Sequence, residues 1–178
     1  MDGFTNKQVA EITKETASSI AYYTNKGFVE PSISKGSGRG SNRIYSKKDI
    51  LKFLLIKELS KHGFSLKKIV GVLNRMATQG VFGDDDPLLN PDAEIMKNYR
   101  VFILIYDKET ENMVVGTKMA AEPNVRKDLV EFFTNADDAE KAFQGYEANL
   151  KSFTINMLDH RSAVVIDVTS LWTKIKHI

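Results

Sequence analysis

The stretch FTNKQVAEITKETASSIAYYTNKG, residues 4–27, contains two short helical patterns with two residues between them. Thr5 is suited to cap a first helix over about residues 6–13, whose apolar side chains share one face. Thr16 is suited to cap a second helix, which ends where Gly27 favours the position after a helix. Because the gap leaves room only for a tight turn, the stretch predicts a helix-turn-helix.

The next residues predict a hairpin-like wing and two more helices. Residues 28–31 are extended because a proline restricts the residue before it. A loop rich in Gly, Ser and basic residues follows at 35–43 and returns into a short apolar segment. Ser46 is suited to cap a third helix of about residues 47–62, and Ser65 begins a fourth. We therefore expect an all-helical winged helix-turn-helix domain over residues 1–78.

The pattern changes after this domain. Residues 79–92 contain two Gly, two Pro and four Asp, which break helices and predict a linker. We place an acidic linker at 79–98 and a small α+β domain at 99–178, so the fold class of the chain is α+β. Strands are expected at 101–106, 113–119 and 162–167, helices over about 124–133 and 137–150, and a terminal helix capped by Thr169 or Ser170.

The charges divide along the same boundary. The chain has a net charge of +2, but residues 1–80 carry 14 Lys and Arg against 6 Asp and Glu, whereas the remainder carries 11 against 17. A basic half is attracted to a polyanion such as double-stranded DNA.

Several classes of protein are excluded by what the sequence lacks. There is no cysteine, which excludes disulfides and thiolate metal sites and leaves a cytoplasmic location unopposed. No run of ~18 apolar residues predicts a membrane helix, and the first residues lack a signal-peptide pattern. No nucleophile triad, metal-ligand spacing or phosphate-binding glycine motif is present. We therefore expect no enzyme, no metal and no cofactor.

Five segments of the N-terminal half resemble, in order and spacing, the DNA-binding domain of the MerR family of bacterial transcription regulators. The resemblance covers residues 4–76, about two-fifths of the chain. It implies a dimer whose two wings distort promoter DNA, with an effector at the C-terminal domain that shifts the distortion. The segments are Phe4–Ile12, Ile20–Tyr23, Lys26–Pro31, Arg43–Ser46 and His62–Ile69.

Three departures from the family pattern stand out. Ala21 takes the place of the family's arginine before the two tyrosines, which removes one expected phosphate contact. The wing is longer and richer in Gly and Ser than the common pattern. The family's long dimerisation helix is interrupted by the linker at Gly80.

Candidate DNA contacts follow from side-chain chemistry. Short polar side chains at the start of the second helix suit base edges, and cations or hydroxyls there and in the wing suit phosphates. Arg39 at the wing tip suits insertion into the minor groove. The full set is Thr16, Ser18, Ser19, Tyr22, Lys26, Lys35, Arg39, Asn42, Arg43 and Tyr45.

The terminal helix is the candidate dimer surface, because it carries an apolar stripe of Leu171, Trp172, Ile175 and Ile178. The alternative is that this helix packs on its own domain. The sequence thus predicts a sequence-specific DNA-binding transcription regulator that binds a promoter as a homodimer and senses a small-molecule or protein effector through its C-terminal domain. Two alternatives remain open, namely a constitutive architectural DNA-binding protein and a regulator controlled by a protein partner. An enzyme fused to a DNA-binding head is the weakest alternative.

Overall fold

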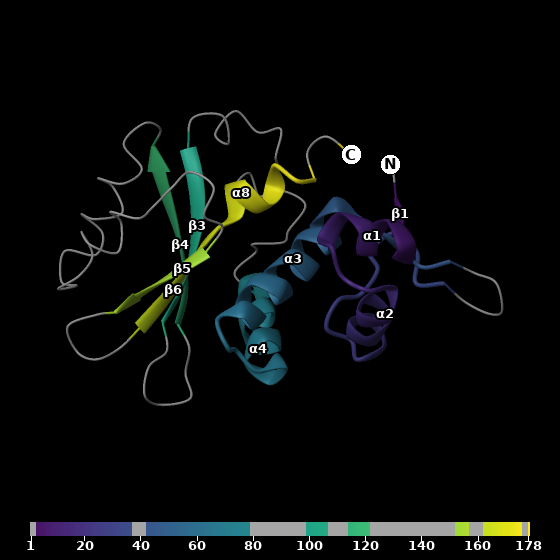
Figure 1. The fold of residues 1–178 in the computed structure, drawn as a ribbon, viewed down its shortest axis with the longest axis horizontal. Coiled ribbons are helices and arrows are strands. Elements are labelled where there is room, and N and C mark those ends of the chain that lie inside the picture. Colours follow the sequence, from purple (N-terminus) through teal and green to yellow (C-terminus); the bar gives the residue numbers. More distant parts are fainter. Residues whose placement is uncertain are drawn as a thin grey trace. The chain divides into compact units, whose positions relative to one another are not determined.

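The computed structural model describes residues 3–36, 42–78, 99–106, 114–121, 152–156, 162–175 and 178. The chain divides into two compact units (Figure 1). One comprises residues 1–73 with 174–178, and the other comprises residues 74–173. No helix in these described ranges is long and apolar enough to span a bilayer.

The first unit begins with the two helices that the sequence predicts. Helix α1 spans Asn6–Thr13 and α2 spans Ala17–Asn25. Thr5 caps α1 in a reciprocal capping box, in which Gln8 Oε1 accepts from the Thr5 amide at 2.9 Å. The Thr16 hydroxyl caps α2 and accepts from the Ser19 amide at 3.0 Å. Both predicted helix starts are confirmed.

The turn between the two helices has an unusual backbone. Lys14, the residue after α1, has φ 55° and ψ 43°, the left-handed conformation. It is the only residue other than glycine with a positive φ in the described part of the chain. This conformation costs an L-residue roughly 1 kcal/mol or more. Contacts from the rest of the unit must therefore hold the turn in place.

The wing is closed at its base by a small sheet. Strand β1 (Phe4–Thr5) pairs antiparallel with β2 (Ile44–Tyr45), with Phe4 opposite Tyr45. The Ile44 amide donates to the Ser34 carbonyl at 2.9 Å and joins the two sides of the wing. The expectation of an all-helical domain is corrected by this pairing, because Phe4 and Thr5 add a strand to the wing.

Helices α3 (Lys47–Lys61) and α4 (Leu66–Thr78) complete the N-terminal fold. Ser46 caps α3 as predicted, through a capping box with Asp49. Figure 1 shows α3 running between the α1–α2 pair and α4. The core between these helices is apolar and nearly closed to solvent. Its largest fully buried side chains include Ile20, Tyr45, Ile50, Phe53, Leu54 and Ile69.

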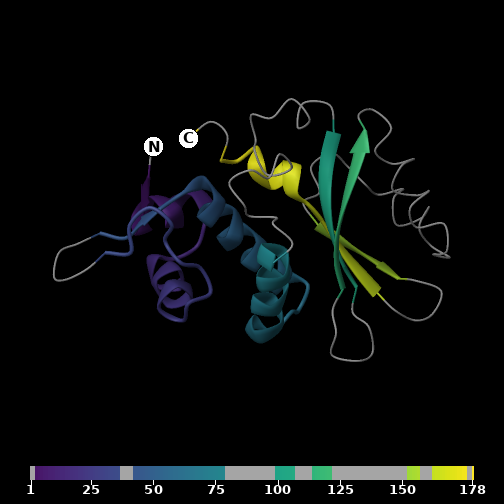
Figure 2. The same cartoon turned by 180° about the vertical axis from the view of Figure 1, so that it is seen from behind.

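The second unit contains a four-stranded antiparallel sheet in the order β4-β3-β6-β5 (Figure 2). Three of its strands coincide with the predicted ones, but β5 was not predicted. The two helices predicted at 124–133 and 137–150 lie outside the described residues, so the α+β class of this unit stays a prediction. The strands are β3 (Tyr99–Tyr106), β4 (Val114–Ala121), β5 (Ser152–Asn156) and β6 (Ser162–Asp167).

A short helix, α8 (Val168–Trp172), follows β6 and packs against β3. Its cap is Asp167, whose carboxylate accepts from the Ser170 amide at 3.0 Å. This corrects the predicted cap at Thr169 or Ser170, because the aspartate at the end of the strand reaches the helix amides first.

The four apolar residues of the predicted dimer surface are not exposed together. Leu171, Trp172 and Ile175 are buried within the chain, whereas Ile178 is 50% exposed. The burial agrees with the alternative that this helix packs on its own chain. Dimerisation through this segment stays a prediction, with Ile178 as its exposed member.

Candidate nucleic-acid interface

The exposed side of α2 carries small polar groups and one aromatic ring. Ser18 and Lys26 are exposed, and Tyr22 is 45% exposed. Tyr23 is half-buried against Phe28 and Phe53. Thus Tyr22 is the outward-facing tyrosine, and it is available to a backbone phosphate.

Two of the predicted base-reading side chains already have structural partners. The Thr16 hydroxyl caps α2 and shares a hydrogen bond of 2.8 Å with the Ser19 hydroxyl. Both groups retain further hydrogen-bonding capacity, because a hydroxyl offers one donor and two acceptor sites. Ser18, which is exposed, is the group that needs no rearrangement to meet a base edge.

The base of the wing is fastened to the end of α2 by two polar contacts. Arg43 Nη2 donates to Asn25 Oδ1 at 2.6 Å. The hydroxyls of Tyr45 and Thr24 share a hydrogen bond of 2.9 Å. These two contacts join residues that are 18 and 21 positions apart in the sequence, and they fix the wing relative to α2.

Tyr45 itself is not a DNA contact. Its side chain is fully buried, its ring packs edge-on against Phe53 at 5.6 Å, and its hydroxyl is engaged by Thr24. This corrects the predicted phosphate contact, because a tyrosine in the core cannot reach the surface without unfolding the wing base.

On the other side of the wing, Lys35 is paired with a carboxylate. Its ammonium lies 2.8 Å from Glu30 Oε2, and both side chains are well exposed. The hydrogen bond from Lys35 lowers the pKa of Glu30, and its charge adds to the effect. To bind a phosphate, Lys35 has to exchange this exposed carboxylate for the DNA.

A buried carboxylate ties the wing to α3. Asp49 is 1% exposed, and its Oδ2 accepts from the Ser32 amide at 2.9 Å, the Ser32 hydroxyl at 2.7 Å and the Ser46 amide at 3.0 Å. Lys52 Nζ donates to Oδ1 at 3.3 Å. One side chain thereby joins the outgoing segment of the wing to the start of α3.

The helix-turn-helix turn is held from α3 by Lys57. Its ammonium donates to the carbonyl oxygens of Thr13 and Lys14, each at 2.8 Å, and lies 3.4 Å from Glu15 Oε1. These carbonyls belong to the end of α1, where a cation is favoured by the helix dipole.

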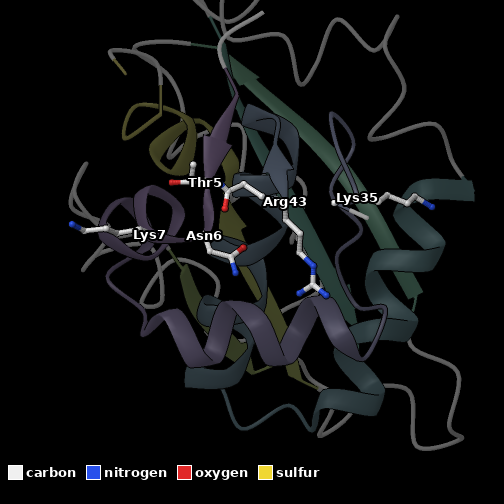
Figure 3. Close-up of a pocket in the computed structure, with 7 residues that line it drawn as sticks. Thr5, Asn6, Lys7, Lys35 and Arg43 are labelled. Carbon is white, nitrogen blue, oxygen red and sulfur yellow. The ribbon is translucent and has the colours of Figure 1, made fainter. Parts of the chain in front are cut away.

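A pocket of about 590 Å³ opens between the start of α1 and the wing (Figure 3). Figure 3 shows Asn6 and Arg43 between Lys7 and Lys35, whose side chains extend to opposite sides. The residues around it are polar or basic, with a single glycine. They are Thr5, Asn6, Lys7, Lys35, Gly36, Asn42 and Arg43.

His62, after α3, makes the stability of this unit sensitive to pH. Burial lowers the pKa of His62 below its ordinary value of 6.5; the charge of Glu58 opposes the shift and that of Lys61 adds to it. The folded state therefore binds the proton less well than the unfolded state, and the free energy of unfolding should fall as the pH drops through 6.5. Urea denaturation at about pH 7.5 and about pH 5.5 should show a smaller loss for His62→Gln than for the parent. Equal losses would contradict this assignment.

The structure places six of the predicted site residues in two groups. Ser18, Tyr22 and Lys26 lie exposed on or just after α2, while Lys35, Asn42 and Arg43 border the wing pocket. Arg39 lies outside the described residues. Sequence reasoning missed Thr24, Asn25 and Asp49, which hold the wing, and Asn6 and Lys7, which border the pocket. A polar residue at the end of α2 was a signal for Asn25, but its partner is 18 positions away.

Comparisons with known proteins agree with this geometry. Residues 4–76 match the MerR HTH family regulatory protein profile. Proteins named uncharacterized HTH-type transcriptional regulators, from Mycobacterium bovis and Mycobacterium tuberculosis, are 33% identical over 79 residues, which is 44% of this chain. The chain matches these relatives over about a third, 35%, of their length. With its two capped helices and its wing, the segment 4–76 is therefore similar to a MerR-type helix-turn-helix domain.

Proposed function

We propose that the protein is a transcription regulator that binds a specific promoter sequence as a homodimer. The observation that carries the proposal is the union of α2 and the wing through Arg43 and Asn25, with their Nη2···Oδ1 bond of 2.6 Å. This contact presents a helix with small polar side chains and a basic wing as one surface. The helix suits the major groove, and the wing suits the adjacent phosphates.

The homodimer is part of the proposal because one helix-turn-helix reads only a half-site. A twofold dimer reads two half-sites related by the same symmetry. The second unit is the proposed dimerisation and effector-sensing part, and it acts in the cytoplasm, where bacterial DNA lies. Helix α2 contains no charged residue, and Lys26 follows it as the C-cap. Sequence reading therefore rests on hydroxyls of α2 and on the wing.

The direct test is a footprint on the DNA upstream of the gene. We expect a protected region with approximate twofold symmetry, and a mass by light scattering of the complex that corresponds to two chains per site. Protection without any preferred sequence would favour an architectural protein. Protection only after a second protein is added would favour control by a partner.

Arg43 should contribute one phosphate contact. Arg43→Ala removes its guanidinium, and binding to the footprinted duplex should weaken by roughly tenfold, since hydrogen bonds to charged groups contribute about 1.5–3 kcal/mol. The slope of log affinity against log salt should fall by about 0.9, the value for one phosphate. The measurement is fluorescence anisotropy over a range of salt concentrations.

Two variants separate the roles of Arg43. Arg43→Lys keeps the charge and should restore the slope. Asn25→Ala keeps the cation but removes its anchor, so it should lower affinity with little change of slope. Unchanged affinity and slope in Arg43→Ala would remove Arg43 from the interface.

A further inference from the structure

We infer that the pocket between the start of α1 and the wing base binds a phosphate group of duplex DNA, and that Lys7 is the cation supplied by α1. This rests on the proposed function and extends the interface to a helix that the sequence did not assign to it. Lys7 and Asn6 are the new contacts, beside Lys35 and Arg43 of the wing.

The chemistry of the lining selects an anion. Three of its side chains are cationic, namely Lys7, Arg43 and Lys35, of which Lys35 must first leave Glu30. The described lining residues include no carboxylate that would hold a metal ion. They also include no aromatic or large apolar side chain on which a base could stack. A phosphate of a polymer therefore fits the pocket better than a free nucleotide, whose base would find no support.

Two polar side chains of the pocket, those of Lys7 and Asn6, have no partner among the described residues and can take part in binding a ligand. Lys7 is exposed, and no hydrogen bond or ion pair engages it in the described part of the chain. The Asn6 side-chain oxygen is buried without a hydrogen-bond partner among the described residues. Buried polar atoms in native proteins nearly always have a partner, so this amide marks an incomplete site. The oxygen itself can only accept, so the amide meets a phosphate by rotating its NH2 group, which donates, into the pocket.

The start of α1 does not act here through its backbone alone. The Thr5 hydroxyl already accepts from the Gln8 amide, and Gln8 Oε1 accepts from the Thr5 amide. The capping box thus uses backbone donors of the first turn. Attraction for an anion must come mainly from the cationic side chains around the pocket.

The pocket is continuous with the α2 surface. Arg43 borders the pocket and also donates to Asn25 at the end of α2. A guanidinium has five N–H donors, and this bond uses one of them. The others remain for a phosphate, so a DNA strand that passes from α2 to the wing crosses the mouth of the pocket at Arg43.

The test compares Lys7→Gln with Lys7→Arg in the full chain. Lys7→Gln should weaken binding to the footprinted duplex by about three- to tenfold near 0.1 M salt and lower the salt slope by about 0.9. Lys7→Arg should keep the parent slope. Glu11→Gln, at an exposed position on the same helix and outside the pocket lining, should not reduce affinity.

The outcomes separate this inference from the proposed function. If the parent binds the duplex and Lys7→Gln has the same salt slope as the parent, the phosphate site is overturned and the proposed function stands. A parent that binds no duplex would overturn the proposed function. Titration with inorganic phosphate, followed by nuclear magnetic resonance of the Asn6 and Gly36 amides, distinguishes the source of the anion. Inorganic phosphate could bind tightly and saturably, and Lys7→Gln could abolish that binding without changing the salt slope for DNA. This result would assign the pocket to a free phosphate and overturn the DNA contact.

Discussion

Replacement of Asp49 by alanine should lower the free energy of unfolding of the N-terminal unit by about 3 kcal/mol or more. The carboxylate is 1% exposed, and three donors converge on its Oδ2, from Ser32 and the Ser46 amide. Alanine would leave these donors without their acceptor and would remove the carboxylate oxygen to which Lys52 donates at 3.3 Å. It would also remove half of the capping box of α3.

Urea denaturation of the full chain gives the loss of stability, and hydrogen exchange locates it. The amide protons of Ser32 and Ser46 both donate to Asp49, so both should lose protection in Asp49→Ala. DNA affinity should fall as well, since the wing is no longer held to α3.

Glu11→Ala is the matched control for Asp49→Ala, because it removes an exposed carboxylate from α1. Its effect on stability should stay within about 0.5 kcal/mol, as for most surface substitutions. A loss in Asp49→Ala no greater than that in Glu11→Ala, with Ser32 and Ser46 still protected, would show that the wing is held by its backbone pairing instead.

Local patterns allowed the helices of the N-terminal unit to be predicted. Thr5, Thr16 and Ser46 were each identified as caps, and each accepts a hydrogen bond from the amide three residues on. Gly27 has φ 74°, as expected for the position after a helix. These features depend on neighbours within one turn of helix, so the order of residues is sufficient to reveal them.

Contacts between distant residues were not predictable in the same way. Tyr45 was interpreted as a phosphate contact because a tyrosine in a basic wing suits one, yet its hydroxyl meets Thr24, 21 positions earlier. The pairing of Phe4 with Tyr45 was missed because two-residue strands leave no periodic pattern. Strand β5 did leave one, since Phe153 and Ile155 alternate with polar residues, and that signal was overlooked.

In the candidate interface, too, the sequence predicted residues that are close in sequence and missed those that only the fold brings together. Lys35, Asn42 and Arg43 were predicted as DNA contacts from their chemistry and their place in the wing. The structure has them around one pocket, and their contact with DNA stays a prediction. Lys7 joined them only in the folded chain, where β1 brings the start of α1 beside the wing. The residues that hold the interface in place were missed, because their partners lie 17 to 44 positions away.

Lys57→Met should lower the free energy of unfolding by about 2 kcal/mol, because it removes two charge-assisted hydrogen bonds while keeping most of the aliphatic stem. The carbonyls of Thr13 and Lys14 would lose a donor that lies 2.8 Å from each. Lys14 has a left-handed backbone, which is strained for an L-residue, so the variant loses a contact that holds this residue in place. Lys67→Met, on the exposed side of α4, is the control and should change stability by no more than about 0.5 kcal/mol.

The DNA affinity of Lys57→Met shows whether Lys57 only stabilises the fold or also sets the geometry of the helix-turn-helix turn. At a temperature where the variant is fully folded, a general loss of stability leaves affinity unchanged, because the folded population is still complete. If Lys57 also sets the angle between α1 and α2, we expect a several-fold loss of DNA affinity under the same conditions. The reason is that α2 and the wing would no longer contact one duplex together. The salt slope should stay at the parent value, because Lys57 is bound to backbone carbonyls and gives no contact to a phosphate. Loss of slope would instead place Lys57 on the DNA, and unchanged affinity would limit its role to stability.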